Sequence, residues 1–155
     1  RRRSGRRLGP SDGERKLLRT TRRTLAWGEC DPAGIIFYPN YYRFMDEAAW
    51  AMFAEAGFPA DRMRAEHFSL PLVNSGCEFF SSPFFGDEIE IRSQVSKWGR
   101  SSLSLAHEFV MAQDGRLLAR GAESRVWCRY ESGPGSPLKS VAIPDEVRQA
   151  LGAPA

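Results

Sequence analysis

The apolar residues of segment 40–56 recur at the spacing of a helix. Steps of one and three residues place them on a single face, which comprises Phe44, Met45, Ala48, Ala49, Met52, Phe53 and Ala56. Asn40 is a typical N-cap residue, and Gly57 can adopt the left-handed conformation that ends a helix. The pattern therefore predicts an amphipathic helix of about 17 residues, the one long helix of the chain.

Most of the remaining chain alternates apolar and polar residues in the manner of half-buried strands. The clearest alternation runs over residues 88–95 and again over 102–109, and segment 98–101 joins these two strands. β-Branched and aromatic residues predict two further strands, at 21–28 and 77–82.

The Asp-Gly pair at 114–115 is a strong hairpin signal and predicts a last long strand over residues 117–130. Within that strand we expect Gly121 to mark a bend or a bulge. Segment 59–75 shows no sustained alternation, and Pro71 keeps its apolar residues out of a central strand, so we interpret it as a connection. One long helix and a meander of antiparallel strands predict an α+β domain, in which a curved sheet wraps the helix.

Between the first predicted strand and the helix lies an acid in a turn. Asp31 stands before Pro32 and is followed by Gly34, which permits a tight reversal of the chain. Such a segment delivers a carboxylate to a helix start, where free N–H groups and the positive end of the dipole can stabilise a developing oxyanion. This arrangement suits hydrolysis, although the same residue types also form ordinary turns.

Residues 28–41, GECDPAGIIFYPNY, resemble the signature of the 4-hydroxybenzoyl-CoA thioesterase family of hotdog-fold proteins. Weaker similarities follow at Lys97-Trp98, Arg125-Val126-Trp127 and Ile143-Pro144. The resemblance implies a hotdog domain over residues 21–147, with a long central helix wrapped by about five antiparallel strands, and a C-terminal tail over 148–155. It also implies that subunits pair their sheets edge to edge into a homodimer or homotetramer, with active sites at the subunit boundary.

The resemblance further implies roles for individual residues. Asp31 would attack the thioester carbonyl or activate water to attack it, while the backbone N–H of Tyr38 polarises the carbonyl oxygen. Substrate-binding positions would be Gly34, Phe37, Tyr41 and Asp46, and coenzyme A would contact Lys97, Arg100 and Lys139. Leu70 stands where the family carries a small polar partner for the 4-hydroxyl group of the substrate, so a benzoyl or phenylacetyl group is expected to serve at least as well.

The net charge of +3 divides unevenly along the chain. Residues 1–20 carry seven Arg and one Lys against two acids, which is +6 and leaves −3 for residues 21–155. Nucleic-acid binding through this basic arm is an alternative function, but no aromatic residues interleave the arginines and no reading module follows. We therefore interpret residues 1–20 as a disordered arm and expect no nucleic-acid partner.

Composition limits the chemistry further. The three cysteines lack C-x-x-C spacing and only two histidines accompany them, so we expect no metal site and no cofactor beyond the coenzyme A of the substrate. Neighbouring carboxylates oppose a thiolate at Cys30, and His107 fits a core or interface position better than a catalytic one. No apolar run approaches the ~20 residues of a membrane span and no secretory leader is evident, so we expect a cytoplasmic protein without a membrane partner.

These observations predict an acyl-CoA thioesterase that hydrolyses an aromatic thioester to the carboxylate and free coenzyme A. A short-chain acyl-CoA thioesterase of the same family is one alternative. A non-catalytic acyl-CoA-binding hotdog protein is another, and it would have no need of Asp31.

Overall fold

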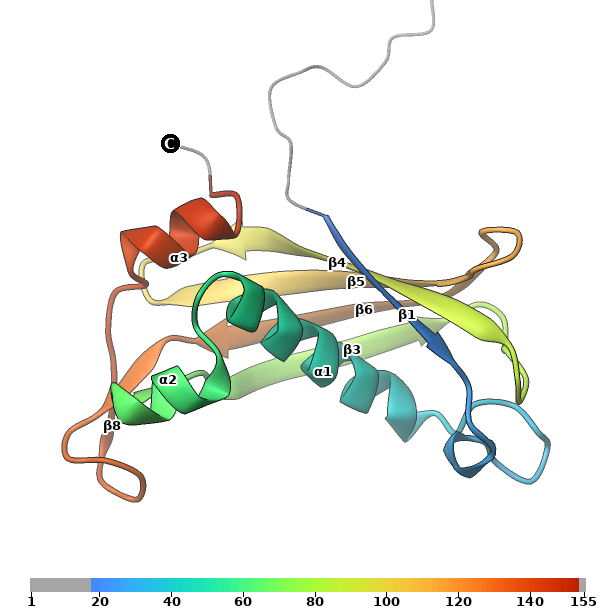
Figure 1. Ribbon diagram of the computed structural model, residues 1–155, viewed down its shortest axis with the longest axis horizontal. Helices are drawn as coiled ribbons and strands as arrows, with labels where there is room; N and C mark the ends of the chain where they lie inside the picture. The colour runs from blue at the N-terminus through green and yellow to red at the C-terminus, as the bar shows by residue number, and fades with distance from the viewer. Residues whose placement is uncertain (1–17, 154–155) are drawn as a thin grey trace, which may run out of the picture.

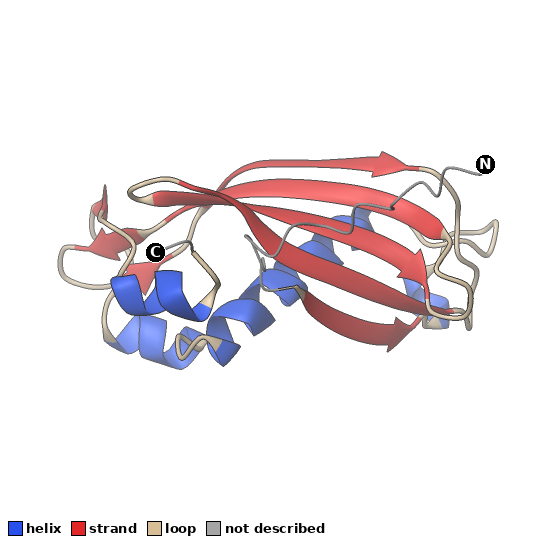
Figure 2. Ribbon diagram, turned by 90° about the horizontal axis from the view of Figure 1, so that it is seen from above, coloured by secondary structure: helices blue, strands red, loops and turns tan. Residues whose placement is uncertain are grey.

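The computed structural model describes residues 18–153, which form a curved antiparallel sheet with helices against one face (Figures 1 and 2). The order of the five strands is β1-β4-β5-β6-β3. Their bounds are Arg19–Thr24 for β1, Glu88–Trp98 for β4, Ser102–Met111 for β5, Leu117–Val126 for β6 and Leu72–Phe79 for β3. A small second sheet joins β2 (Phe68–Ser69), β7 (Cys128–Tyr130) and β8 (Leu138–Ser140). The helices are α1 (Pro39–Glu55), α2 (Ala60–Ala65), α3 (Asp145–Ala150) and a 3-10 turn, η1 (Trp27–Glu29).

Helix α1 begins one residue before the predicted start, and a glycine in the left-handed conformation terminates it. Tyr38, not Asn40, is its N-cap, because Pro39 takes the first helical position, where no backbone donor is needed. At the other end Gly57 has a φ of +89°, and the N–H of Phe58 donates to the Phe53 carbonyl over 2.8 Å. This is a Schellman cap, as the position of Gly57 predicted.

The apolar face of α1 packs on the inner face of the sheet and divides the core into two clusters. One surrounds the first half of the helix and includes Phe44, Met45, Ile89, Ile91, Phe109 and Leu118. The other surrounds the second half and includes Met52, Phe53, Phe58, Leu103, Leu105 and Trp127. Tyr42, Arg43 and Glu47 on the opposite side of α1 are exposed, so the sheet covers one face of the helix and does not surround it.

Three predicted strands have different bounds in the structure. The first strand is β1, which ends at Thr24, because the chain turns into η1 where extended structure was predicted to continue to Gly28. The strand predicted at 77–82 is β3, which starts at Leu72 directly after Pro71. Because β3 is an edge strand, the proline costs no ladder hydrogen bond, and part of the predicted connection 59–75 is strand.

The last strand is shorter than predicted, and Gly121 has another role than a bulge. Strand β6 ends at Val126, after which the buried Trp127 leaves the sheet and β7 joins the small one. Gly121 pairs regularly with residues of β3 and β5. A Cβ atom there would lie 2.0 Å from the Met45 sulfur, so the glycine allows α1 to approach the sheet closely.

The folded residues extend slightly beyond the predicted domain 21–147, since β1 begins at Arg19 and α3 ends at Ala150. Residues 1–17 of the predicted arm and residues 154–155 of the predicted tail lie outside the described part of the chain. Among residues 18–153, no helix combines the length and apolar character needed to cross a membrane.

Candidate active site

Asp31 lies in a tight loop that the backbone closes on itself. A bridge between Cys30 and Ile36 brings the arms of the loop together, and the Asp31 N–H donates to the Ile35 carbonyl over 2.8 Å. Gly34 completes the turn with a φ of +79°, and its N–H donates to the Asp31 carbonyl over 2.9 Å. The tight turn predicted from Gly34 is confirmed.

The Asp31 carboxylate uses one oxygen to hold the turn. Oδ1 accepts the N–H of Ala33 over 2.8 Å, while Oδ2 accepts no hydrogen bond from residues 18–153. The side chain borders a cavity of about 500 Å³, which is lined by Trp27, Gly28, Cys30, Asp31, Pro32, Gly34 and Phe85. A carboxylate oxygen is therefore available to an electrophile bound in this cavity.

Cys30 borders the same cavity but is poorly suited to attack. Burial and the neighbouring Glu29 and Asp31 carboxylates raise the pKa of its thiol above the ordinary value. Because the thiolate is the nucleophilic form, this environment disfavours Cys30 as a nucleophile.

The start of α1 lies close to the base of the Asp31 loop. The N–H of Phe37 donates to the carbonyl of Glu29 over 2.9 Å, which pairs the residues flanking the loop. Tyr38 follows as the N-cap, and its side chain is 62% exposed. Its N–H has no acceptor among the described residues, as expected of a helix start, and so remains available to an oxyanion.

Of the four predicted substrate-binding residues, Gly34 alone lines the Asp31 cavity. Phe37 is half exposed and meets the Tyr38 ring edge-on, with centroids 5.6 Å apart. Tyr41 is buried and packs against the rings of the half-exposed Phe79 and the buried Phe109, and burial raises the pKa of its hydroxyl far above the ordinary value. The roles of Phe37 and Tyr41 in substrate binding stay predictions.

The fourth predicted residue, Asp46, begins a chain of polar contacts beneath α1. Arg125 donates from Nη2 to Asp46 Oδ1 over 2.6 Å and from Nε to Glu123 Oε1 over 2.7 Å. Glu123 Oε1 lies 3.8 Å from Nε2 of His107, whose Nδ1 is 2.8 Å from the hydroxyl of Ser93. Asp46 is thus held by a buried arginine, and its contact with a substrate stays a prediction.

Sequence reasoning singled out Asp46 and His107, and His107 is buried as expected, but it missed Glu123 and the buried link that Arg125 makes between them. Glu123 and Arg125 alternate with Ala122, Ser124 and Val126, so β6 shows no simple apolar alternation. The available signal was the regular spacing of Gly121, Glu123 and Arg125, which places all three on the inner face of the strand.

The predicted coenzyme A contacts lie at the far end of the sheet from Asp31 (Figure 1). The Asp31 loop pairs with residues just before β4, through a bridge between Ile35 and Phe84. Lys97 is the second-to-last residue of β4 and Arg100 follows the strand at its other end, about 30 Å away for an eleven-residue strand. Lys139 lies in β8, at that same distant end, and pairs with Glu131. One chain therefore does not bring these residues to the Asp31 cavity.

A metal site is not evident in the part of the chain that the structure describes. Within residues 18–153, no three His, Cys, Asp or Glu side chains are arranged to hold an ion.

Comparison with known proteins places these features in context. The family described as the thioesterase-like superfamily matches residues 25–151. A 4-hydroxybenzoyl-CoA thioesterase of Pseudomonas sp. (strain CBS-3) is 28% identical over 131 residues, which cover 81% of this chain and 91% of that protein. A 1,4-dihydroxy-2-naphthoyl-CoA hydrolase of Trichodesmium erythraeum (strain IMS101) is 22% identical over 84% of this chain and 92% of its own.

A solved structure shares the same architecture at higher identity. A gentisyl-coenzyme A thioesterase superposes with a TM-score of 0.72 and 33% identity, covering 86% of this chain and 98% of that chain. The family match over residues 25–151 includes α1 and the Asp31 loop.

Proposed function

The chain belongs to the thioesterase-like superfamily and is an acyl-CoA thioester hydrolase like the relatives that it matches; we propose that its substrate is an aromatic acyl-CoA and that Asp31 is its catalytic carboxylate. Two observations carry this proposal: Asp31 lines a cavity and its Oδ2 accepts no hydrogen bond from residues 18–153, and the base of its loop is bonded to Phe37, just before the start of α1. The Oδ2 oxygen attacks the thioester carbonyl or activates the water that does. The Tyr38 N–H stabilises the oxyanion, a contribution of roughly 3 to 4 kcal/mol for one such donor.

The walls of the Asp31 cavity favour a flat acyl group. Trp27 and Phe85 present two exposed aromatic side chains there, and aromatic pairs add ~0.5 to 1.5 kcal/mol beyond their burial. A long flexible chain would lose rotamer entropy on entering and gain no such stacking. The named relatives act on 4-hydroxybenzoyl, dihydroxynaphthoyl and gentisyl thioesters, which are all aromatic.

The 4-hydroxyl group is not required of this substrate. Leu70 is buried in the core, and its carbonyl accepts a long hydrogen bond of 3.5 Å from Arg125. Asp46 already pairs with the same arginine. An unpaired buried hydroxyl costs roughly 1 to 3 kcal/mol, so benzoyl and phenylacetyl groups suit the site at least as well.

The functional unit is a homodimer, from which the expected tetramer can be built. Strand β3 is an edge strand whose outer side pairs with no other strand of residues 18–153, and it exposes Leu72, Val73 and Phe79. If two β3 strands pair antiparallel about a two-fold axis, the two chains run in opposite directions. The turn between β4 and β5 of one chain then lies at the same end of the joined sheet as the Asp31 loop of its partner. Lys97 and Arg100 then lie at the same end of the joined sheet as the other chain's catalytic loop.

A panel of purified thioesters tests the function, with released coenzyme A thiol as the readout. We expect kcat/KM for benzoyl-CoA and phenylacetyl-CoA to equal or exceed that for 4-hydroxybenzoyl-CoA, and to exceed those for butyryl-CoA and palmitoyl-CoA. Preference for either aliphatic chain contradicts the aromatic assignment. Binding without thiol release from any substrate indicates the non-catalytic acyl-CoA-binding alternative. A preference of about 100-fold for 4-hydroxybenzoyl, or ~2.7 kcal/mol, shows that Asp46 alone recognises the hydroxyl.

A further inference from the structure

Glu29 is an unusually buried acid in an exposed turn. It is the last residue of η1, two positions before Asp31, and only 9% of it is exposed, whereas Trp27 in the same turn is 79% exposed. A buried carboxylate is costly unless charged or hydrogen-bonding partners surround it. The partners of Glu29 therefore indicate what the burial achieves.

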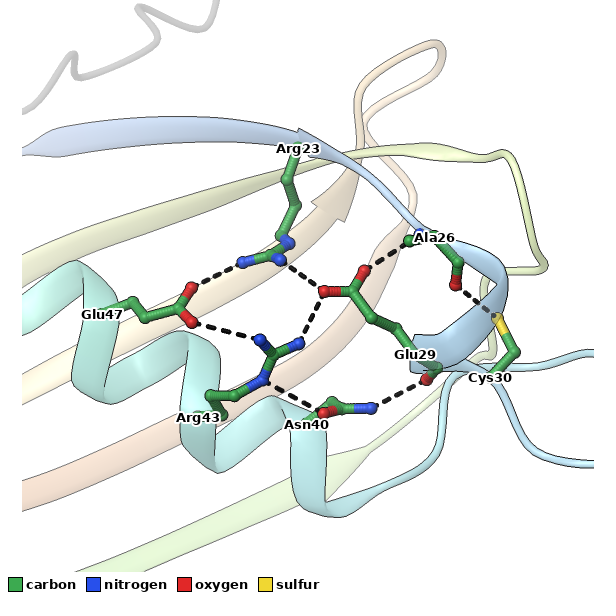
Figure 3. Close-up of polar contacts among 7 residues, drawn as sticks. All are labelled: Arg23, Ala26, Glu29, Cys30, Asn40, Arg43 and Glu47. Carbon is green, nitrogen blue, oxygen red and sulfur yellow. Dashed lines mark hydrogen bonds and ion pairs between the residues drawn. The ribbon is translucent and has the colours of Figure 1, made fainter.

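The Glu29 carboxylate joins three segments of the chain (Figure 3). Oε1 accepts Nη2 of Arg23 from β1 over 2.5 Å and Nη2 of Arg43 from α1 over 2.6 Å. Oε2 accepts the N–H of Ala26 at the start of η1 over 3.0 Å. Burial raises the pKa of Glu29, but the Ala26 hydrogen bond and the two arginines outweigh it and hold that pKa below the ordinary value.

The backbone carbonyl of Glu29 makes a second set of contacts, toward the other side of the Asp31 loop. It accepts the N–H of Phe37 over 2.9 Å and the side-chain amide of Asn40 over 2.8 Å. Asn40 thus anchors the first turn of α1 to Glu29 instead of capping the helix. One residue is bonded to both arms of the loop, two positions before Asp31 and next to the segment that leads into Tyr38.

We propose that Glu29 is a positioning residue, which fixes the distance and angle between the Asp31 carboxylate and the Tyr38 N–H. The inference rests on the proposed function, since it concerns the geometry of that site. A carboxylate and an oxyanion donor must face the same carbonyl group, and a displacement of about 1 Å can cost ~10²-fold in rate. The contacts of Glu29 lie on both sides of the loop and so hold this geometry.

Glu47 provides a matched control within the same ion-pair cluster. Its carboxylate contacts Arg23 over 2.7 Å and Arg43 over 3.4 Å, the same two arginines that bind Glu29. Glu47 lies on the exposed side of α1 and touches neither arm of the Asp31 loop. Glu29→Gln and Glu47→Gln therefore both weaken the cluster, but only the first loosens the residue whose backbone carbonyl accepts the Phe37 N–H and the Asn40 amide.

Steady-state kinetics of these variants test the proposal. We expect Glu29→Gln to lower kcat by about 10-fold or more with KM changed less than about 2-fold, and Glu47→Gln to leave both unchanged. In the Asp31→Asn background Glu29→Gln should cause no further loss, because both act on one step. Equal losses of thermal stability with unchanged kcat in both single variants would overturn the proposal and leave a structural ion pair.

Hydrogen exchange gives a readout that does not depend on hydrolysis. The Phe37 N–H should exchange faster in Glu29→Gln than in wild type or Glu47→Gln, and unchanged protection would overturn the inference even if the enzyme is active. If wild type hydrolyses no thioester, the proposed function fails while the exchange result still reports on the loop. Should Glu29→Gln not fold, Asn40→Ala removes one anchor without burying an unpaired charge, and it should lower kcat in the same direction.

Discussion

The two oxygens of the Asp31 carboxylate have separate tasks. Oδ1 accepts the Ala33 N–H and so closes the turn, while Oδ2 accepts no hydrogen bond from residues 18–153, and the residue lines the cavity. The structural and chemical roles of this residue are therefore compatible, and neither excludes the other. An amide in place of the acid keeps the first task and removes the second.

Asp31→Asn should consequently abolish turnover and leave the fold intact. Asparagine accepts the same turn hydrogen bond but can neither attack a carbonyl nor take a proton, so we expect a loss on the order of 10³ or more in kcat. Asp114→Asn is the matched control, because Asp114 closes an equivalent turn with the N–H of Arg116 outside the cavity. Retention of more than about a tenth of wild-type kcat in Asp31→Asn would exclude the assigned role.

At the scale of elements, the contact between α1 and the sheet contains a polar chain between two apolar clusters. Arg125 and Glu123 from β6 are almost fully buried and connect Asp46 of α1 to His107 of β5. Burial lowers the pKa of Arg125, but the two carboxylates outweigh it and raise that pKa above the ordinary value. The guanidinium therefore stays charged in the interior, beside the buried Glu123 carboxylate.

The free energy of unfolding should depend on pH through Glu123, which lies in the contact between α1 and the sheet. Burial raises the pKa of Glu123, but His107 and Arg125 outweigh it and hold that pKa below the ordinary value. A lowered folded-state pKa adds stability that is complete above the unfolded pKa, about 4.3, and is lost as pH falls through the folded value. We expect Glu123→Gln to cost about 3 kcal/mol at pH 7.

Denaturant unfolding at several pH values measures the difference in the free energy of unfolding between wild type and Glu123→Gln, which we call the gap. The gap should shrink as pH falls below about 4.3, where the unfolded chain binds the proton first, and should be lost once pH passes the lowered folded-state pKa of Glu123. Glu108→Gln is the control, because Glu108 forms an exposed ion pair with Arg120 on the outer face of β5. A gap for Glu123→Gln that stays constant from pH 7 to pH 3 would contradict the assigned role of its charge.

The elements that the sequence predicted best are those specified by local chemistry. The α1 helix ends at the Gly57 cap, and β4 and β5 meet at the turn predicted from residues 98–101. The predictions that were wrong depend on long-range context. Pro71 borders a strand because β3 is at the edge of the sheet, and Gly121 is a glycine because Met45 of α1 packs closely against it. Periodicity cannot report such contacts, since it describes one segment at a time.

The candidate site shows the same division. Asp31, Gly34 and the start of α1 are close in sequence, so their association could be predicted from a single stretch. Glu29 was not singled out because its role depends on Arg23 in β1 and Arg43 in α1, whose side chains meet only in the folded chain. Buried charges with distant partners are therefore where sequence reasoning failed.

At the scale of the whole molecule, the candidate catalytic loop and the predicted coenzyme A contacts lie at opposite ends of the five-stranded sheet. The Asp31 loop pairs with Phe84 just before the start of β4, whereas Lys97 lies in the last residues of that strand and Arg100 follows it. Figure 1 shows the two ends of β4 far apart. Pairing two chains through β3 would bring complementary ends together and would also cover Leu72 and Val73, of which Val73 is 61% exposed. The proposed dimer would therefore join the catalytic and coenzyme A parts of one site.

Mixing variants tests whether one site uses residues from two chains. One protein carries Asp31→Asn and the other carries Lys97→Ala with Arg100→Ala, and both are refolded together. In a shared-site dimer each mixed pair has one intact site, because the intact Asp31 and the intact basic residues come from different chains. Random pairing then restores about a quarter of wild-type kcat/KM at low substrate concentration, although each variant alone has little.

The matched control places all three substitutions on one chain and refolds it with wild type. Shared sites in the mixed pairs are then all defective, so about a quarter of wild-type activity remains from wild-type dimers, whereas independent subunits would keep about half. Independent subunits would also give no recovery in the first mixture. That pair of results, or sedimentation as a monomer at micromolar concentration, would rule out the shared site, because a catalytic loop and a coenzyme A contact at opposite ends of one chain could then not serve the same substrate.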